Sequence, residues 1–247
     1  MIDALFSIGG FGLITAIYFL AKYLLVDRHT EPKSMWKKVL GFGYITVVIV
    51  SQLIVNVLNS KELCSDTPQV LNAFVYTLFP NFFILGSLMM IMTVLPGWKA
   101  PFSNTIGYIV VWALGVNAVL IKLLKDKNGS KLMQEILSNK SLIINEMTRE
   151  NFKLFMGKMA TDKLLENGYK KLPAYEKLWH YVVIKDSISE FIWIMLAGSL
   201  VISTIYNNML DMKCDIPPSK RKAAADAFEK KMKQTDKPKE KLFTVHD

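Results

Sequence analysis

Few side chains in this sequence have the types and spacing that catalysis or metal binding requires. The three histidines, His29, His180 and His246, lie far apart, and two cysteines are too few for a zinc site. The chain contains no nucleophile elbow, phosphate-binding glycine loop, dinucleotide fingerprint or HExxH helix. We therefore expect no catalytic, cofactor-binding or metal site, and we do not expect an enzyme.

Four side-chain amides stand inside otherwise apolar runs, and they are the polar groups with the clearest expected role. Gln52 and Asn56 are four residues apart, so they lie on one face of a helix. Neutral amides at membrane depth usually hydrogen-bond to a neighbouring helix. We predict contacts between helices through Gln52, Asn56, Asn81 and Asn117, with Asn117 bonded to Gln52 or Asn56. The alternative is a polar groove lined by the same four amides.

The elements that hold these amides are long apolar runs. The chain has 247 residues, 51% of them hydrophobic, and a mean hydropathy of +0.26. Its apolar residues are concentrated in blocks of about 20, the length that crosses roughly 30 Å of hydrocarbon. The sequence therefore predicts an all-α integral membrane protein with about five transmembrane helices. These cover about residues 5–26, 39–58, 70–95, 105–124 and 189–210, and Pro80 is expected to kink the third or to begin its straight part.

Four segments follow from these runs. Residues 1–124 are expected to form a four-helix transmembrane region. In residues 125–186, apolar side chains recur at helical spacing, which indicates a small extramembrane subdomain of two or three amphipathic helices. The last of these runs toward the membrane, where it can continue into a fifth transmembrane helix at 187–210. Residues 211–247 form a basic, partly disordered tail.

The sequence PGWKAPFSN, between the third and fourth runs, predicts a tight turn at the membrane surface. Its two prolines disfavour helix at the preceding residues, and its glycine allows positive φ. Tryptophan and lysine settle where lipid tails meet water, and Ser103 or Asn104 can cap the next helix. We predict an interfacial hairpin or interaction site at residues 96–104, formed by Pro96, Gly97, Trp98, Lys99, Pro101, Phe102, Ser103 and Asn104.

The net charge of +9 reflects lysines and arginines that gather between and after the apolar runs. Because short basic loops stay in the cytosol, we expect the tail, the hairpin and the first loop on the cytosolic face, with residues 125–186 opposite. In the tail, a cluster of basic residues is the candidate for contact with lipid head groups, an acidic partner or nucleic acid. These residues are Lys220, Arg221, Lys222, Lys230 and Lys231.

Two further expectations depend on this topology. Cys64 and Cys214 fall on opposite faces of the membrane when five runs cross it, so we do not expect them to pair. Glu190, near the start of the last run, is expected to reach interfacial water, because the sequence offers no partner acid or base at similar depth.

The hairpin also carries a family signal. The pattern PGW-K-x-PFSNT-x-GY is formed by Pro96, Gly97, Trp98, Lys99, Pro101, Phe102, Ser103, Asn104, Thr105, Gly107 and Tyr108. With its flanks, residues 79–116, it resembles a membrane-protein family of large icosahedral double-stranded DNA viruses, the nucleocytoplasmic group that includes the chlorella viruses. In such viruses a lipid bilayer lies beneath the protein shell, and multi-span proteins link the two.

The resemblance implies a virion inner-membrane protein, such as a minor capsid component that anchors the shell. The expected function is thus structural, in an internal membrane derived from the host endoplasmic reticulum, with capsid proteins, other virion membrane proteins or packaged nucleic acid as partners. The alternative is a channel, transporter or insertase-like protein with a polar groove between its helices.

Overall fold

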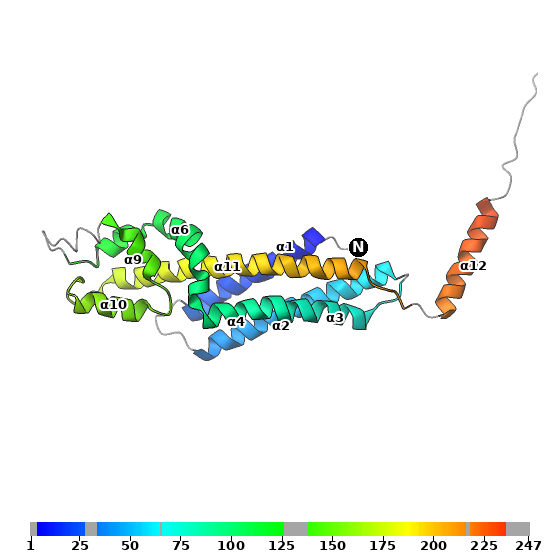
Figure 1. The fold of residues 1–247 in the computed structure, drawn as a ribbon, viewed down its shortest axis with the longest axis horizontal. Coiled ribbons are helices and arrows are strands. Elements are labelled where there is room, and N and C mark those ends of the chain that lie inside the picture. The colour runs from blue at the N-terminus through cyan, green and yellow to red at the C-terminus, as the bar shows by residue number, and fades with distance from the viewer. Residues whose placement is uncertain (1–3, 28–33, 65, 126–137, 216–217, 236–247) are drawn as a thin grey trace, which may run out of the picture.

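The computed structural model describes residues 4–27, 34–64, 66–125, 138–215 and 218–235, and within them the chain is helical, without β-strands (Figure 1). A single isolated bridge between Leu124 and Leu165 is the nearest approach to a sheet in these residues. Four helical segments are long and apolar enough to cross a membrane. They are Ala4–Asp27, Lys38–Leu63, Val70–Val94 and Pro173–Leu210. The all-helical, membrane-compatible architecture predicted from the apolar runs is therefore confirmed.

These segments lie side by side as a four-helix bundle (Figure 1). The bundle consists of α1 (Ala4–Lys22) with the π-helical turn η1 (Tyr23–Asp27), α2 (Ser34–Leu63), a composite third helix, and α11 (Pro173–Leu210). The composite helix is formed by α3 (Val70–Pro80), the π-helical turn η2 (Asn81–Gly86) and α4 (Ser87–Val94). The chain stays helical at Pro80, and the wider π turn follows directly, since proline removes one hydrogen bond of the α-helical ladder.

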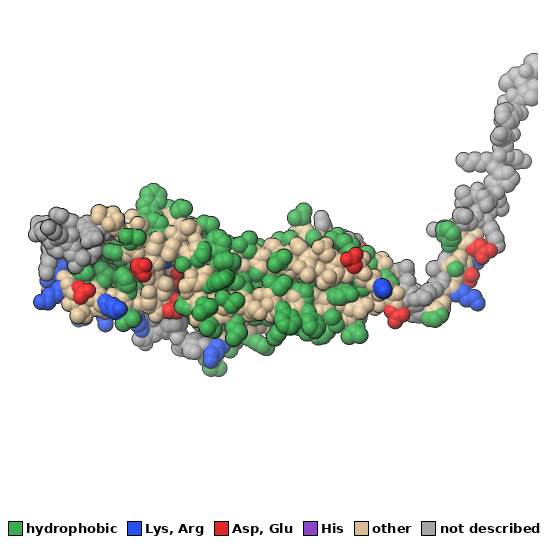
Figure 2. Space-filling view, in the orientation of Figure 1, with side chains coloured by type: hydrophobic (Ala, Val, Ile, Leu, Met, Phe, Trp, Pro, Cys, Tyr) green, Lys and Arg blue, Asp and Glu red, His purple; other side chains and the backbone are tan. Residues whose placement is uncertain are grey.

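The bundle is apolar on its outside and partly polar inside. Large apolar side chains such as Phe42, 77% exposed, point away from the bundle, and the space-filling view shows hydrophobic side chains along its flank, with charged groups toward its two ends (Figure 2). On α2, by contrast, Gln52, Asn56 and Ser60 are buried. This arrangement is compatible with lipid as the surrounding solvent, because apolar side chains can face lipid without cost while unpaired polar groups cannot.

The predicted run at 105–124 does not form one long helix. After the 3₁₀ turn η3 (Pro96–Lys99) come α5 (Ala100–Phe102), the π-helical turn η4 (Ser103–Gly107), α6 (Tyr108–Ala113) and α7 (Val116–Ile121). Gly115 separates α6 from α7 with a left-handed φ of 91°. The run at 105–124 is therefore not among the four candidate spans, and the predicted count of five is not reached within the described residues.

Part of this run packs into a second core outside the bundle, whereas Ile109 and Trp112 are 62% and 58% exposed. Val116 and Leu120 of α7 join residues of α9 (Lys140–Glu146), α10 (Phe152–Thr161), η5 (Tyr169–Lys171) and the first half of α11. Leu178 and Val182 of α11 belong to this core, whereas Val201 and Ile205 belong to the core of the bundle. One continuous helix thus passes through both cores, and we call the described part outside the bundle, residues 105–125 and 138–184, the helical subdomain.

The direction of the four bundle helices determines which segments of the chain lie together at each end of the bundle. The N-terminus, the turn after α2 and the end of α11 lie at one end of the bundle, and the hairpin and the helical subdomain lie at the other (Figure 1). The expectation that the hairpin shares a face with the tail, opposite residues 125–186, is therefore wrong. The predicted topology counted residues 105–124 as a membrane crossing, and this crossing placed every later segment on the opposite face of the membrane.

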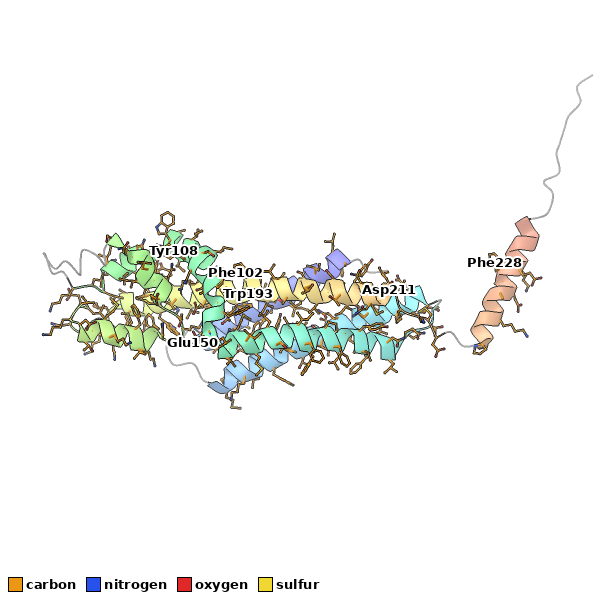
Figure 3. All side chains as sticks on the ribbon, viewed as in Figure 1. Phe102, Tyr108, Glu150, Trp193, Asp211 and Phe228 are labelled. Atoms are coloured by element: carbon orange, nitrogen blue, oxygen red, sulfur yellow. A yellow bond between two sulfur atoms is a disulfide. The ribbon has the colours of Figure 1, made fainter. Side chains whose placement is uncertain are left out.

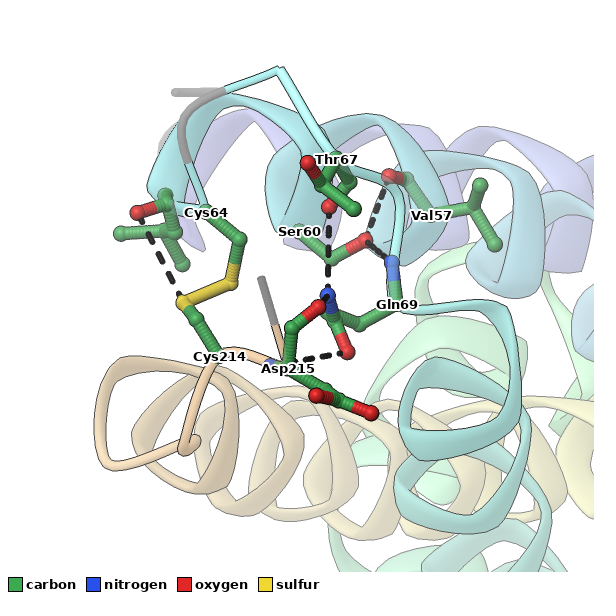
Figure 4. Close-up of a disulfide and its surroundings, with 8 residues drawn as sticks. Val57, Ser60, Cys64, Thr67, Gln69, Cys214 and Asp215 are labelled. Atoms are coloured by element: carbon green, nitrogen blue, oxygen red, sulfur yellow. Dashed lines mark hydrogen bonds between the residues drawn. A yellow bond between two sulfur atoms is a disulfide. The ribbon is translucent and has the colours of Figure 1, made fainter. Parts of the chain in front are cut away.

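The two cysteines also lie together, at the end of the bundle opposite the hairpin. Cys64 and Cys214 form a disulfide, with 1.98 Å between the sulfur atoms, so the prediction that they do not pair is wrong (Figure 4). Gln69 closes the same end of the bundle, because its side-chain amide donates to the carbonyl of Asp215 at 3.1 Å. Its backbone N–H donates to the hydroxyl of Ser60 at 2.9 Å.

Beyond the disulfide, α12 (Pro218–Thr235) stands apart from the bundle (Figure 1). Lys222 and Lys230 are exposed on it. The side chains of Lys220, Arg221 and Lys231 lie outside those that the structure describes. The binding role predicted for this basic cluster stays a prediction.

Candidate functional site

Eight charged side chains gather where the bundle meets the helical subdomain. We call this cluster the charged junction, and it consists of Lys22, Asp27, Lys99, Arg149, Glu150, Lys185, Asp186 and Glu190. Four cations face four carboxylates, so their formal charges cancel. The residues come from α1, η1, η3, the turn before α10 and the middle of α11, which makes the junction the point at which distant segments are held together.

Glu190 of α11 lies at the centre of the junction. Its carboxylate forms an ion pair with Lys22 and lies 3.5 Å from the Lys99 ammonium and 3.7 Å from the Arg149 guanidinium. Its side chain is only 13% exposed. The expectation that Glu190 reaches interfacial water without a partner is therefore wrong. Its partners come from three separate segments, and Lys22 is 168 residues away, so no local spacing in the sequence indicates them.

Arg149 ties the turn before α10 to both α11 and the end of α1. Its guanidinium donates to the Asp27 carboxylate at 3.0 Å and to the Ser187 hydroxyl at 2.8 Å. Its backbone N–H donates to the Asp186 carboxylate at 2.9 Å. Trp179 adds a further bond, because its indole N–H donates to the Asp27 carbonyl at 3.1 Å. The buried arginine is thus bonded to two elements of the bundle at once.

The titration of the junction follows from these pairs. Burial alone would lower the pKa of Arg149, but the nearby carboxylates, Glu190 first among them, outweigh burial and raise it. The pKa of Lys99 is likewise raised, because Glu190, Asp186 and Glu150 outweigh the effect of its burial. Burial would raise the pKa of Glu150, yet the Lys99 ammonium, 2.7 Å away, holds it below its ordinary value. These groups therefore stay ionised at neutral pH.

The predicted hairpin is held against α11. The Lys99 carbonyl accepts a hydrogen bond from the Ser189 hydroxyl at 2.6 Å, and the Trp98 carbonyl accepts one from the Trp193 indole at 3.1 Å. The Phe102 ring meets the Trp193 ring edge-on, with 5.0 Å between centroids (Figure 3). Lys99 is only 2% exposed, so its side chain is buried within the protein.

The second half of the hairpin contacts α11 one turn earlier. The Ser103 hydroxyl donates to the Asp186 carboxylate at 2.9 Å, and Asn104 accepts a hydrogen bond from the Lys185 ammonium at 3.3 Å. Neither side chain caps a helix, in contrast to the expectation from the sequence, because the chain is already helical at Ser103. Gly107 lies so close to α11 that an added Cβ would come within 2.6 Å of the Lys185 carbonyl.

The prolines and the glycine of the hairpin differ in what they contribute to the turn. Pro96 begins the 3₁₀ turn η3, and Pro101 lies in the first turn of α5, where its missing N–H removes no helical hydrogen bond. Gly97 is not among the residues with positive φ in the described chain, so its conformational freedom is not what forms the turn. The prolines therefore act as expected, and the close approach to α11 is the feature that the sequence did not reveal.

Two of the three π-helical turns supply residues of the junction or its contacts. Asp27 ends η1 and Ser103 begins η4, and both side chains are buried. Such turns occur frequently at functional sites, where they redirect side chains that a regular helix would point elsewhere. Here Ser103 of η4 donates to Asp186 of α11, whereas Asp27 of η1 accepts from Arg149.

Three of the four predicted amides lie within the bundle, apart from the junction. Asn81 donates to Gln52 at 2.6 Å, and Asn56 donates to Thr77 at 2.7 Å, so three of the four amides do link helices. The Gln52 amide nitrogen and the Asn81 amide oxygen have no further partner within the described residues. Asn117 lies in α7 of the helical subdomain, and its predicted bond with Gln52 or Asn56 is not formed.

A small cavity of about 100 Å³ borders these amides between α1, α2 and α11. Gln52, Asn56 and Asn59 line it together with apolar residues such as Phe11 and Ile202. One turn before Gln52, the fully buried Val48 separates the amides from the hydroxyl pair of Thr15 and Tyr44. The polar groups of the bundle therefore form separate clusters.

Comparison of the chain with protein-family models, with curated proteins and with solved structures finds no match. The chemistry of the site must therefore be judged from its own geometry. Among the described residues, no group of three or more His, Cys, Asp or Glu side chains is placed to hold a metal ion. The junction carboxylates are each engaged by a cation or a backbone N–H, which is the arrangement of a structural ion-pair network.

Proposed function

We propose that this chain is a structural, non-enzymatic membrane protein that holds its helical subdomain in a fixed position at one surface of a bilayer. The observation that carries the proposal is the continuity of α11, whose 38 residues pass through both cores. At 1.5 Å per residue this helix is about 57 Å long, nearly twice the hydrocarbon thickness of a bilayer. Its first half therefore extends from the membrane as a rigid support for the subdomain.

The charged junction supports the same function. A single helix could bend or rotate between two domains, but Arg149 and Lys99 attach the turn before α10 and the hairpin to the middle of α11. Ion pairs shielded from water by packing resist such motion, because separating them would leave buried charges unpaired. A partner that binds the subdomain would thereby be fixed to the membrane.

We further propose that this partner is the protein shell of a large icosahedral DNA virus and that the bilayer is the internal membrane of the virion, derived from the host endoplasmic reticulum. The support is the resemblance of residues 79–116 to membrane proteins of such viruses. The residues of that pattern include Lys99, Phe102, Ser103 and Gly107, all of which contact α11. The pattern thus corresponds to the attachment of the subdomain.

Two measurements test this function. The chain should be detected by mass spectrometry in purified virions and released only with detergent. A photo-crosslinking residue at Leu154, 65% exposed on α10, should then form adducts with shell proteins. The same residue at Leu196, 54% exposed on the flank of the bundle, should form adducts with lipid only and is the matched control. Absence from virions would exclude the viral role, and identical adducts at both sites would exclude anchoring through the subdomain.

A channel, transporter or insertase-like function is the second candidate, and one observation favours it. Gln52 lines a cavity between the bundle helices, and its amide nitrogen and the amide oxygen of its partner Asn81 lack hydrogen-bond partners, as groups that contact a solute would. Solute or ion flux in proteoliposomes that is lost on replacing Gln52 or Asn81 by leucine would support this candidate. Flux that is absent, or unchanged in these variants, would leave the amides as contacts between helices.

A further inference from the structure

A larger cavity, of about 410 Å³, opens at the end of the bundle next to the charged junction. It lies between the ends of α1 and α4, the beginning of α2 and the middle of α11. Ligand sites in proteins typically enclose about 300–1,000 Å³, so this cavity has the volume of a small-molecule site. It is distinct from the amide cavity, with which it shares no lining residue.

The lining of this cavity has a charged part and an apolar part. Lys22, Lys38, Lys99, Glu150 and Glu190 form the charged part, and three lysines against two glutamates leave a formal charge of +1. Phe19, Met89, Met92 and Ile194 form much of the remainder. A soluble anion would be complementary to the first part only, whereas an amphipathic molecule would be complementary to both.

The lysines differ in how far their charge is already neutralised. Lys22 and Lys99 form ion pairs with Glu190 and Glu150. Lys38 is exposed at the start of the second span, and within the described residues no ion pair of Lys38 is found. An ammonium group has three N–H donors, so Lys22 and Lys38 retain donors for an anionic group in the cavity.

The position of the cavity along the bundle indicates which amphipathic molecule it can bind. Lys38 begins the segment Lys38–Leu63, and Thr93 lies next to the end of the segment Val70–Val94. Both segments are long and apolar enough to span the bilayer, and both residues line the cavity. The cavity is therefore level with the boundary between hydrocarbon and head groups. Lysines at this depth attract anionic lipid head groups.

We propose that this cavity binds one anionic phospholipid, with the phosphate of its head group at Lys38 and Lys22 and its acyl chains along Met89 and Met92. The bound lipid would fill the space beside the junction and join the bundle to the surrounding leaflet. The inference goes beyond the anchoring function and does not depend on it, since a protein with any role in the membrane could hold such a lipid.

The test is native mass spectrometry of the purified full-length chain in detergent, titrated with phosphatidylglycerol. We expect one lipid to bind per chain. Lys38→Gln should weaken binding about fivefold, the effect of one lysine charge near lipid. Lys61→Gln is the matched control, because Lys61 is also an exposed lysine of α2 but lies at the opposite end of the bundle, paired with Asp66.

A second pair of variants tests the cavity without changing charge. Gly41 lines the cavity, and a Cβ added there meets no atom within 4 Å, so Gly41→Leu should fold and fill the space. Gly43 is equally open but does not line the cavity, which makes Gly43→Leu its control. Gly41→Leu should abolish binding, and Gly43→Leu should leave it intact.

Three outcomes of the lipid titrations would overturn the proposal. They are the absence of a bound lipid at one per chain, equal weakening by the variants and their controls, and equally tight binding of phosphatidylcholine. Inorganic phosphate is the probe for a soluble anion: displacement of the lipid by millimolar phosphate would show a simple anion site and would also overturn the proposal. Persistence of the lipid under phosphate would support it.

Discussion

Replacing Arg149 by methionine should separate the helical subdomain from the bundle. Methionine keeps much of the apolar stem, but it removes the guanidinium that donates to Asp27 at 3.0 Å and to Ser187 at 2.8 Å. It also leaves Asp27, whose side chain is 4% exposed, as a buried carboxylate without its arginine. Breaking a buried ion pair by removing one partner typically costs about 3–5 kcal/mol, so we expect a loss of that size in the free energy of unfolding.

The assay is denaturant unfolding in detergent micelles, followed by tryptophan fluorescence. Trp179 is a suitable reporter, because its indole donates to the Asp27 carbonyl and would sense the separation directly. Lys61→Met is the control: this exposed ion pair with Asp66 should contribute no more than about 1 kcal/mol. Adding Asp27→Asn to Arg149→Met should recover part of the loss, since the unpaired buried charge is then removed. If Arg149→Met costs no more than Lys61→Met, the junction does not hold the subdomain in place.

Two other perturbations probe the same region. The folded-state pKa of Glu150 lies below its ordinary value of 4.5 and that of Lys99 above its ordinary value of 10.5, so their contributions to stability are complete between these values. Unfolding titrations should show stability lost as pH falls below 4.5, through the Glu150 pKa, and as it rises above 10.5, through the Lys99 pKa. Gly107→Ala should destabilise by about 1–3 kcal/mol, because its Cβ would crowd the Lys185 carbonyl, whereas Gly97→Ala, open on all sides, should have little effect in the same assay.

Each of these perturbations has an outcome that would contradict it. A Glu150→Gln variant should lose less stability on acidification than the unsubstituted chain, and an unchanged profile would mean that other carboxylates cause the loss. Equal effects of Gly107→Ala and Gly97→Ala would mean that the hairpin is not closely packed on α11.

The sequence predicted the bundle helices well because lipid imposes a length on them. About 20 apolar residues in a row are needed to cross the hydrocarbon, and α1, α2 and α11 each contain such a run. The run at 105–124 met the same criterion and yet belongs to a core with Val116 and Leu120. Apolar composition cannot distinguish a protein core from lipid. The left-handed φ of Gly115 that separates α6 from α7 cannot be read from the sequence, because α1 and α2 also contain glycines.

The candidate site was harder to predict than the helices. Gln52 and Asn81 were expected to contact another helix, and their type alone was sufficient, because a buried amide requires a partner. Glu190 gave no such indication, since an acid near a helix end can equally reach water. Its cations belong to three segments whose meeting depends on the tertiary fold. Ser103 and Asn104 were assigned to helix capping for the same reason, because the distant side of each contact is invisible in a local pattern.

The disulfide between Cys64 and Cys214 has a consequence for how the protein matures. It joins the end of the second bundle helix to the end of the last one, across 150 residues. Such bonds form and persist in oxidising compartments, so both thiols must be delivered to that side of the membrane before they can react. In a chain whose last helix has not inserted, the two thiols lie apart. The disulfide can therefore form only after insertion of the last helix is complete. Once it has formed, a single proteolytic cut between the cysteines leaves the two fragments linked.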